Sequence, residues 1–203
     1  MQEHELNKKM CLWNRCYLVR NGINASSFEA FPVRPRRARS LVFFGRISYQ
    51  KGFDILLRVA ELTGLPIKAY GDWESEQMRQ YCEGLIGSKG LDVDFCGYRH
   101  ISEIEFRGDM LFVAPSRFEG LPYAVLEMAA LKIPVLLSDC NGHRELLLEG
   151  DKLVFNSEDP QSCVEIIQSL SPHMISASVD ARAKAALEYS FERFVGDLRR
   201  CFR

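Results

Sequence analysis

A chain of 203 residues that is 47% hydrophobic and 26% charged has the composition of one ordinary globular domain, which excludes disorder and leaves little room for two domains. The longest apolar runs have the length of strands and the first ten residues are polar, so we expect neither a transmembrane helix nor a signal peptide. Seven scattered cysteines without C-x-x-C spacing indicate reduced thiols in a cytoplasmic protein, and with four isolated histidines they provide no metal site.

Residues 1–40 form an N-terminal extension and linker that carries an excess of positive charge. They hold eight Lys or Arg against three Glu, a net charge of +5, which leaves −6 for residues 41–203. The local patterns predict a helix over 5–15, a short strand over 16–19, a turn at Asn21-Gly22 and an extended linker over 33–40.

The basic excess is greatest at Arg34, Arg36, Arg37 and Arg39. These residues fit a solvated linker or, alternatively, a peripheral contact with anionic lipid at the inner face of the membrane or with phosphate. They do not fit a nucleic-acid site, because no aromatic residues are interleaved and the rest of the chain is acidic.

From residue 41 to residue 203 the chain alternates apolar strands with helices and forms the second predicted domain. The predicted strands are 41–44, 67–70, 93–96, 110–114, 134–137 and, more weakly, 153–155. The predicted helices are 53–63, 74–87, 102–107 with Ser102 and Glu105 as a capping box, 122–131, 143–148, 160–170, 176–188 and 191–202. This order predicts an α/β, Rossmann-like open parallel sheet with helices on both faces, which binds its ligand at the carboxyl ends of the strands.

The loop after the first strand runs from Gly45 to Gly52 and contains Arg46 and Lys51 just before a helix begins. A glycine turn, free N–H groups at a helix N-terminus and two cations together favour an anion, so this loop is a candidate phosphate site. The loop is not a Walker loop, since G-x-x-x-x-G-K-[ST] is not satisfied. The alternative is that both cations are ordinary solvated charges.

The loop after the fourth strand leads into a helix for which Pro122 fits the first position, and the N–H groups of Gly120 and Leu121 are then directed to a ligand. Glu127 lies five residues into that helix, about 7.5 Å along its axis, which matches the offset from a diphosphate to the ribose of the same nucleotide. Its carboxylate would accept two hydrogen bonds from the ribose diol. Glu119 lies near the far end of such a diphosphate. The alternative is that Glu127 is an ordinary exposed helix residue.

Three further loops contribute candidate residues at the carboxyl ends of strands. After the fifth strand, Gly142 is expected to form a tight turn at the ligand, and His143 is either a base or a capping or packing residue. After the second and third strands, the residues suited to form the walls of a nucleobase site are Gly71, Tyr98 and Arg99.

Together these motifs resemble the C-terminal, donor-binding half of the glycosyltransferase family 4 enzymes, the group 1 transferases of GT-B architecture. The matching residues are Gly45-Arg46, Lys51-Gly52, Pro115-Ser116, Glu119-Gly120, Pro122, Glu127, Pro134-Val135, Gly142 and Glu145. Asn21-Gly22-Ile23 and Phe28 look like the segment that joins the two domains of that family, so the resemblance runs from about residue 16 to the C-terminus.

The resemblance implies a catalytic set in which Arg46 and Lys51 hold the donor diphosphate and Glu119 contacts the donor sugar. It also implies that Glu127 binds the ribose and that the amides of Gly120 and Leu121 contact phosphate. The activity it implies is transfer of a sugar from a nucleotide-diphosphate sugar to a glycan or lipid-linked acceptor, with retention of configuration and without a metal or another cofactor. Cations and a helix dipole would stabilise the departing diphosphate.

The sequence departs from this family at Trp73, Lys132 and Asn141, where the family often has glycine, and we expect Trp73 to crowd the second loop. GT-B enzymes also place an acceptor-binding domain before this one, so we expect the acceptor half from a longer enzyme or from another chain, and little activity from these 203 residues alone. One alternative is a non-catalytic nucleotide-sugar-binding module that acts with a separate partner. A dinucleotide-binding oxidoreductase fits the sheet but lacks G-x-G-x-x-G.

Overall fold

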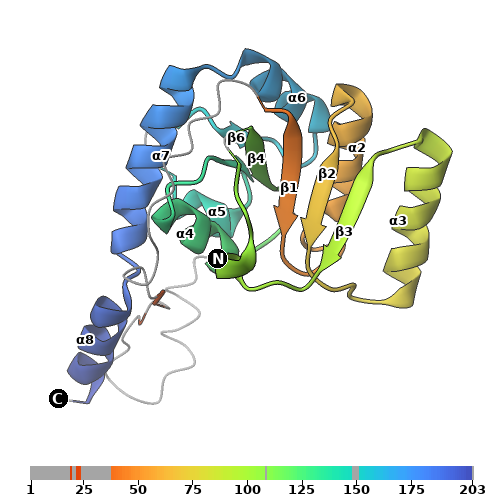
Figure 1. The fold of residues 1–203 in the computed structure, drawn as a ribbon. Coiled ribbons are helices and arrows are strands. Elements are labelled where there is room, and N and C mark those ends of the chain that lie inside the picture. The colour runs from red at the N-terminus through yellow and green to blue at the C-terminus, as the bar shows by residue number, and fades with distance from the viewer. Residues whose placement is uncertain (1–18, 20–21, 24–37, 108, 148–150, 203) are drawn as a thin grey trace.

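A computed structural model describes residues 19, 22–23, 38–107, 109–147 and 151–202 of the chain (Figure 1). The helix expected over 5–15, most of the strand over 16–19, most of the basic linker and Phe28 lie outside these residues. Ile23 is described and pairs with the end of the chain, because its N–H donates to the Tyr189 carbonyl at 2.7 Å and its carbonyl accepts from the Phe191 N–H at 3.0 Å.

The described residues fold around a six-stranded parallel sheet with the strand order β3-β2-β1-β4-β5-β6. The strands are β1 (Ser40–Phe44), β2 (Ile67–Tyr70), β3 (Val93–Gly97), β4 (Met110–Ala114), β5 (Val135–Ser138) and β6 (Val154–Phe155). The prediction of an α/β, Rossmann-like open parallel sheet is therefore confirmed. The strand order reverses between β1 and β4, and the chain after each of these strands continues into a helix on the opposite face of the sheet from the other. Sheets of this type bind ligands at such a reversal point.

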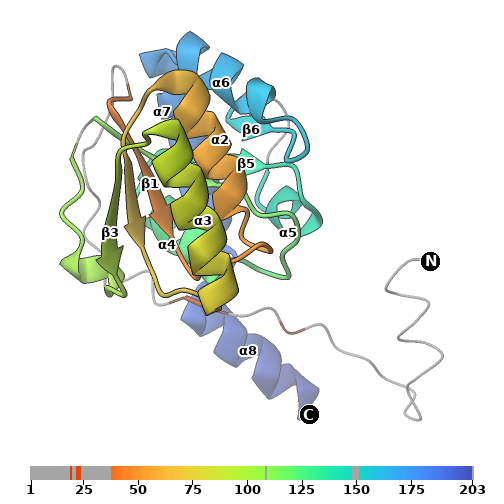
Figure 2. The ribbon, with the colours of Figure 1, turned by 90° about the vertical axis from the view of Figure 1, so that its right-hand side faces the viewer.

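Helices cover both faces of the sheet, as expected (Figures 1 and 2). The helices are α2 (Phe53–Thr63), α3 (Glu76–Lys89), α4 (Tyr123–Ala130), α5 (Asn141–Arg144), α6 (Pro160–Ser169), α7 (Pro172–Leu187) and α8 (Phe191–Cys201). Alternate strand residues enter different buried clusters: Leu41 and Phe43 join one with α2 and α6, and Val42 joins the other with α4. This two-residue alternation produces the layers on each side of the sheet.

The helix predicted over 102–107 is wrong. The chain there makes only a three-residue 3-10 helix, η2 (Ile101–Glu103). Its N-cap is His100, whose side chain accepts from the Ser102 N–H, and the Glu103 carboxylate in turn accepts from the His100 N–H at 2.8 Å. Ile104 and Phe106 are both buried under the sheet whereas Glu105 is exposed. That two-residue period keeps the segment extended, and burial outweighs the local capping signal.

Two predicted helix starts are also corrected. Pro122 is the N-cap of α4 and not its first helical residue, since its backbone has ψ of 102° and the helix begins at Tyr123. The helix predicted over 143–148 begins two residues earlier, at Asn141, and ends at Arg144. Both starts are one or two residues from the predicted position, the second helix ends four residues early, and each loop keeps its position at the end of a strand.

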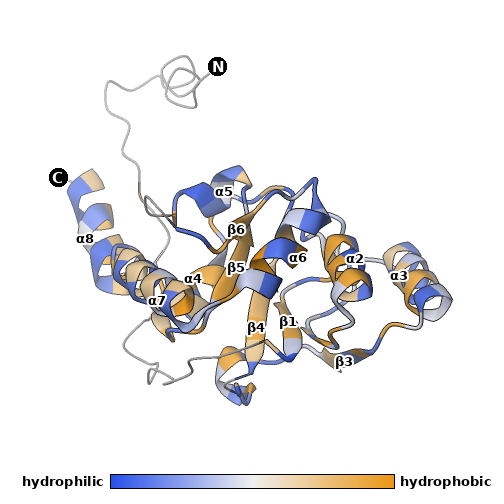
Figure 3. Cartoon of the chain, turned by 90° about the horizontal axis from the view of Figure 1, so that it is seen from above, coloured by the Kyte–Doolittle hydropathy of each residue, from blue (hydrophilic) through white to orange (hydrophobic). Residues whose placement is uncertain are grey.

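A buried ion pair fixes α7 to the sheet. The Arg182 Nε atom donates to Asp151 Oδ2 at 2.7 Å, and both side chains are almost fully buried. The same guanidinium donates to the backbone carbonyls of Val135 and Leu153, so each of its three nitrogen atoms has a hydrogen-bond acceptor. Beyond α7, the last helix α8 extends away from the sheet (Figure 3) and none of its residues is buried. Within the described residues, no helix is both long enough and apolar enough to cross a membrane.

Candidate functional site

Two ion pairs fix the loop after β4 at the reversal point of the sheet, one to the loop after β1 and one to the first turn of α2. Lys51 Nζ lies 2.6 Å from Glu119 Oε1, and Arg117 makes a bidentate pair with Asp54 at 2.7 and 2.8 Å. The Arg117 guanidinium also lies 3.8 Å from the centre of the Tyr49 ring. Lys51 and Glu119 were predicted as site residues from the sequence, whereas the pair between Arg117 and Asp54, in the first turn of α2, was missed.

Glycine at position 52 allows these two loops to approach each other. Gly52 has φ of +68°, and a Cβ atom there would lie 2.0 Å from the Pro115 carbonyl oxygen. No other residue fits both the left-handed backbone and the contact. The same residue precedes α2 as its N-cap, so the approach of the loops also sets where that helix begins.

The Glu119 carboxylate is held from three sides and is only 7% exposed. Besides Lys51, the Ser116 hydroxyl donates to the same oxygen, Oε1, at 2.7 Å. On the third side, a Cβ atom at Gly142 would lie 2.6 Å from Glu119 Cβ and 2.5 Å from the Gly120 carbonyl oxygen. Gly142 does not form the tight turn that we expected, since it belongs to the short helix α5; the close contact with Glu119 is what requires a glycine there.

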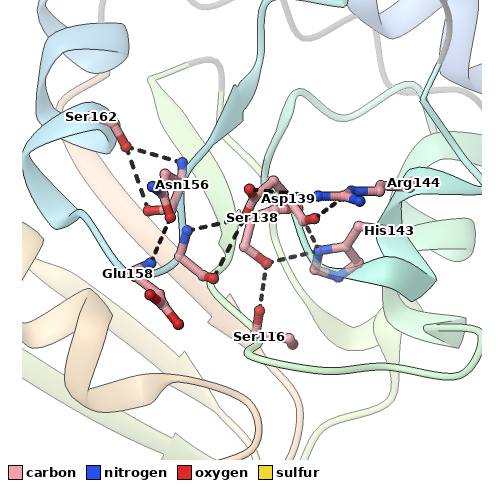
Figure 4. Close-up of polar contacts among 9 residues, drawn as sticks. Ser116, Ser138, Asp139, His143, Arg144, Asn156, Glu158 and Ser162 are labelled. Atoms are coloured by element: carbon pink, nitrogen blue, oxygen red, sulfur yellow. Dashed lines mark hydrogen bonds and ion pairs between the residues drawn. The ribbon is translucent and has the colours of Figure 1, made fainter.

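His143 is completely buried, with 0% of its surface exposed. Its Nδ1 atom lies 3.0 Å from both the Oγ and the carbonyl oxygen of Ser138, and the Ser138 hydroxyl donates to the Ser116 carbonyl at 2.6 Å (Figure 4). Burial lowers the pKa of His143 to about 4, against the opposing influence of the Ser138 carbonyl and the Glu119 charge. Of the two interpretations drawn from the sequence, the packing residue is therefore confirmed, since a buried, neutral imidazole does not face a ligand.

Glu127 is a half-buried carboxylate on α4 without a partner. No hydrogen bond or ion pair reaches it from the residues that the structure describes. Burial raises the pKa of Glu127, and the charge of His100 opposes this. The interpretation of Glu127 as an ordinary exposed residue is therefore wrong, because its side chain is partly buried, and its role in binding a ribose stays a prediction.

The N–H groups of Gly120 and Leu121, just before α4, donate to no acceptor within the described part of the chain. The first turn of the helix that follows adds the positive end of its dipole. Free amides and a helix N-terminus beside Lys51 are features that favour an anion, and anion binding here stays a prediction.

A cavity of about 380 Å³ opens at the carboxyl ends of β1, β2 and β3. It brings together five of the predicted binding residues, and its lining consists of Phe44, Gly45, Arg46, Tyr70, Gly71, Asp72, Trp73, Glu74, Tyr98 and Arg99. Arg46 is 64% exposed and lies 3.8 Å from the Glu74 carboxylate at this cavity, a loose pair that leaves the guanidinium available to a ligand.

Trp73 is partly buried and also lines this cavity. Its ring packs on Phe53 and Phe95, with centroids 6.2 and 4.8 Å away, and the expected crowding of the loop stays a prediction. The described residues contain no group of three or more His, Cys, Asp or Glu that would hold a metal ion. The absence of a metal from the reaction remains an expectation.

A family model described as "Glycosyl transferases group 1" matches residues 38–172, which include every loop of this site. The chain belongs to the group 1 glycosyl transferases. Similar proteins include the lipopolysaccharide core biosynthesis mannosyltransferase LpsB of Rhizobium meliloti, 25% identical over 171 residues that cover 74% of this chain and 47% of that protein. A glycogen synthase of Mycobacterium tuberculosis is 28% identical over 144 residues, 66% of this chain and 34% of that one. The chain thus spans about half the length, or less, of such curated relatives.

Solved structures of glycosyltransferases have the same fold. A sucrose-phosphate synthase from Thermosynechococcus elongatus superposes on 99% of this group 1 transferase with a TM-score of 0.81 at 17% identity, and the match covers 55% of that chain. Anabaena HepE in complex with UDP-glucose superposes on 89% with a TM-score of 0.74 at 18% identity, again over 55% of that chain. The described domain therefore has the Rossmann-like architecture found in GT-B glycosyltransferases.

Proposed function

We propose that this domain binds a nucleotide-diphosphate sugar and takes part in transfer of the sugar to a glycan or lipid-linked acceptor, with retention of configuration. The diphosphate lies between the loop after β1 and the N-terminus of α4. Arg46, Lys51 and the amides of Gly120 and Leu121 bind it and stabilise the charge that develops when the sugar departs. Because an ammonium has three donors, Lys51 keeps its bond to Glu119 while it donates to phosphate.

The observation that carries this proposal is the unpaired Glu127 carboxylate, whose pKa is raised by burial. Leaving a carboxylate half-buried without a partner destabilises the fold, so the cost is offset only when a ligand supplies donors. A ribose diol supplies two of them to one carboxylate, in the geometry that Glu127 offers from the fifth residue of α4. The complex with UDP-glucose formed by Anabaena HepE, which has the same fold, supports a nucleotide sugar as the ligand.

In this proposal Glu119 binds the sugar of the donor, and the cavity binds its nucleobase. Both described contacts to Glu119 are made to Oε1, which leaves Oε2 for a hydroxyl of the donor sugar. The nucleobase lies in the cavity at the ends of β1, β2 and β3, with Tyr98 and Arg99 as flat walls.

The acceptor is bound by residues outside this domain. GT-B transferases act in the cleft between two domains, and this chain spans about half the length of its relatives. The acceptor half therefore belongs either to the same longer protein or to a partner subunit, and in the second case the chain is a nucleotide-sugar-binding module. The basic residues near Arg36 favour an acceptor at an anionic membrane surface, which predicts vesicle binding that weakens with salt.

Calorimetric titration of the chain with UDP and GDP tests donor binding directly. We expect one of the two to bind, and Glu127→Gln to weaken that binding about 10- to 100-fold because a hydrogen-bonded charge is lost. Glu165→Gln is the matched control, since Glu165 is an exposed carboxylate on α6. Equal binding by both variants, or no binding of either nucleotide at millimolar concentration, would contradict the proposal.

A further inference from the structure

We propose that His143 is a positioning residue that fixes the Glu119 carboxylate toward the donor sugar, through the hydrogen bonds of Ser138 and Ser116. The inference rests on the proposed function, in which Glu119 contacts the sugar. His143 itself touches no ligand, because it is completely buried. Its effect on Glu119 passes through backbone and hydroxyl contacts at the ends of β4 and β5.

The contacts of Nδ1 determine which nitrogen of His143 carries the proton. Nδ1 lies 3.0 Å from the Ser138 carbonyl oxygen, which only accepts hydrogen bonds, so Nδ1 is the donor. The Ser138 hydroxyl uses its single proton on the Ser116 carbonyl at 2.6 Å, so it too accepts from Nδ1. One imidazole N–H therefore fixes both oxygen atoms of Ser138 (Figure 4).

These contacts continue to Glu119 within one short loop. The Ser138 hydroxyl holds the Ser116 carbonyl, and the hydroxyl of the same Ser116 donates to Glu119 Oε1 at 2.7 Å. Gly142, the neighbour of His143, lies directly against Glu119 Cβ, as the 2.6 Å distance of a hypothetical Cβ atom shows. The start of α5 thus meets Glu119 through a hydrogen-bonded path and through a van der Waals contact.

A side chain needed only for its volume would not be a histidine here. The Nε2 atom is buried and has no hydrogen-bond partner among the described residues. A buried acceptor without a donor destabilises a fold, and a leucine would fill similar space without that penalty. The imidazole is therefore explained by its N–H, which a leucine lacks.

The test compares nucleotide sugars with the corresponding diphosphates, using UDP, UDP-glucose, GDP and GDP-mannose with the full chain. For the nucleotide that the wild-type chain prefers, we divide the Kd of the diphosphate by the Kd of the nucleotide sugar. A change of this ratio between variants reports a change in the sugar contact. We expect His143→Leu to reduce this ratio about five- to tenfold, the effect of one or two misplaced hydrogen bonds, and to leave the Kd of the diphosphate within about twofold. His143→Asn keeps a donor at the δ position and should restore most of the ratio.

Ser138→Ala is a second variant with a smaller change, and it decides the question if His143→Leu does not fold. It removes the hydroxyl that links the imidazole to Ser116, so it should reduce the same ratio. A wild-type ratio in both variants would overturn the inference. A parallel loss of affinity for diphosphate and nucleotide sugar would also overturn it, because that pattern indicates a merely structural role.

Nitrogen-15 NMR of the histidine rings separates the failure of this inference from that of the proposed function, since it needs no donor. We expect one histidine to stay neutral from pH 8 to pH 5 with its proton on Nδ1, and its Nδ1 shift to change in Ser138→Ala, which removes the hydroxyl 3.0 Å from Nδ1. A proton on Nε2, or a ring unaffected by Ser138→Ala, would overturn the role of His143 whatever the chain binds. If the spectrum is as expected but the chain binds no nucleotide, the proposed function is overturned. The contact between Glu119 and a donor sugar is then overturned as well, although the hydrogen bonds of His143 are confirmed.

Discussion

Lys51 and Glu119 are 68 residues apart in the sequence, and the Lys51 ammonium lies 2.6 Å from the Glu119 carboxylate. The two side chains are 26% and 7% exposed, so the pair is largely shielded from solvent and salt. It joins the loops after β1 and β4, between which the strand order of the sheet reverses. The fold therefore brings these two site residues together, and their ion pair in turn stabilises the contact between the two loops.

This pair should show strong energetic coupling in a double-mutant cycle. Lys51→Met leaves a nearly buried carboxylate without its cation and should destabilise the chain by about 1–3 kcal/mol, whereas the double variant with Glu119→Gln should recover much of that loss. Urea unfolding of the four proteins provides the measurement. The exposed Arg79–Glu83 pair on α3 is the control, and the prediction fails if its coupling is as large.

Gly142→Ala should destabilise the chain although alanine is the better helix former. The new Cβ atom would lie within 2.6 Å of Glu119 and Gly120 backbone or Cβ atoms, so the loop after β4 has to move, at a cost of about 1–3 kcal/mol. Gly84→Ala in α3 meets nothing within 4 Å and should stabilise the chain by about 0.5–1 kcal/mol. Thermal unfolding of the two variants should therefore shift in opposite directions, and a shift in the same direction would refute the close contact.

Glu127→Gln should make the free chain more stable as it weakens nucleotide binding. The pKa of Glu127 is raised, so the charged carboxylate disfavours the folded state and wild-type stability falls as pH rises through that pKa. At neutral pH the neutral amide avoids this penalty. The melting temperature without ligand should rise relative to the wild type at pH 7 and the difference should disappear at low pH. A lower melting temperature at pH 7 would show that Glu127 has a structural partner.

The buried His143 predicts a loss of stability in mild acid. Its pKa in the fold is about 4, below the ordinary value of 6.5, so the unfolded chain binds the extra proton first as pH falls. Stability that is fully present above pH 6.5 is lost between pH 6.5 and pH 4, by about 2 kcal/mol between pH 7.5 and pH 5. Comparison of the wild type with His143→Asn by urea unfolding isolates this contribution. Parallel pH dependence of the two proteins would contradict the lowered pKa.

Lys132→Gly should stabilise the chain, although the substitution removes a side chain. Lys132 has φ of +59° and occupies the first position after the C-cap of α4, where Ile133 N–H donates to the Met128 carbonyl at 2.9 Å. This end of the helix is a Schellman motif, which favours glycine, so we expect a gain of about 0.5–1 kcal/mol. Lys184→Gly in α7 has ordinary helical surroundings and should lose about 1 kcal/mol. Thermal unfolding distinguishes the two, and a loss in both would contradict the prediction.

The layers of the fold could be predicted because local pattern and tertiary structure agree along most of the chain. The strands Ile67–Tyr70 and Met110–Ala114 have the predicted bounds, since each is an apolar run of strand length between turn residues. The helix Phe53–Thr63 does as well, because Gly52 and Gly64 both adopt the left-handed backbone at its ends. The prediction of a helix over 102–107 was wrong because the burial of Ile104 and Phe106 depends on contacts with α4 and β4, and a local capping signal gives no information about such contacts.

The site could be predicted only at the level of which loops contribute to it. Parallel strands bring their carboxyl ends to one edge of the sheet, so the loops that contain Lys51 and Glu119 were expected at the same edge. The sequence did not predict that the two side chains form a direct ion pair. The Arg117–Asp54 pair depends on the register that sets Leu41 beside Leu111, which no pattern in the sequence encodes. The burial of His143 likewise depends on where β5 places α5 against Glu119. Contacts of this kind follow from the assembled sheet and not from any one segment.

Amide chemical-shift mapping with UDP and GDP locates the bound nucleotide directly. If a diphosphate binds between the β1 loop and the N-terminus of α4, the amides of Gly45, Gly120 and Leu121 will shift most, and these shifts will disappear in Lys51→Met. A second cavity of about 400 Å³, next to Leu62 and Leu170, provides the internal comparison. Shifts confined to that cavity, or none at either place with millimolar nucleotide, would show that the diphosphate does not bind at the loops after β1 and β4.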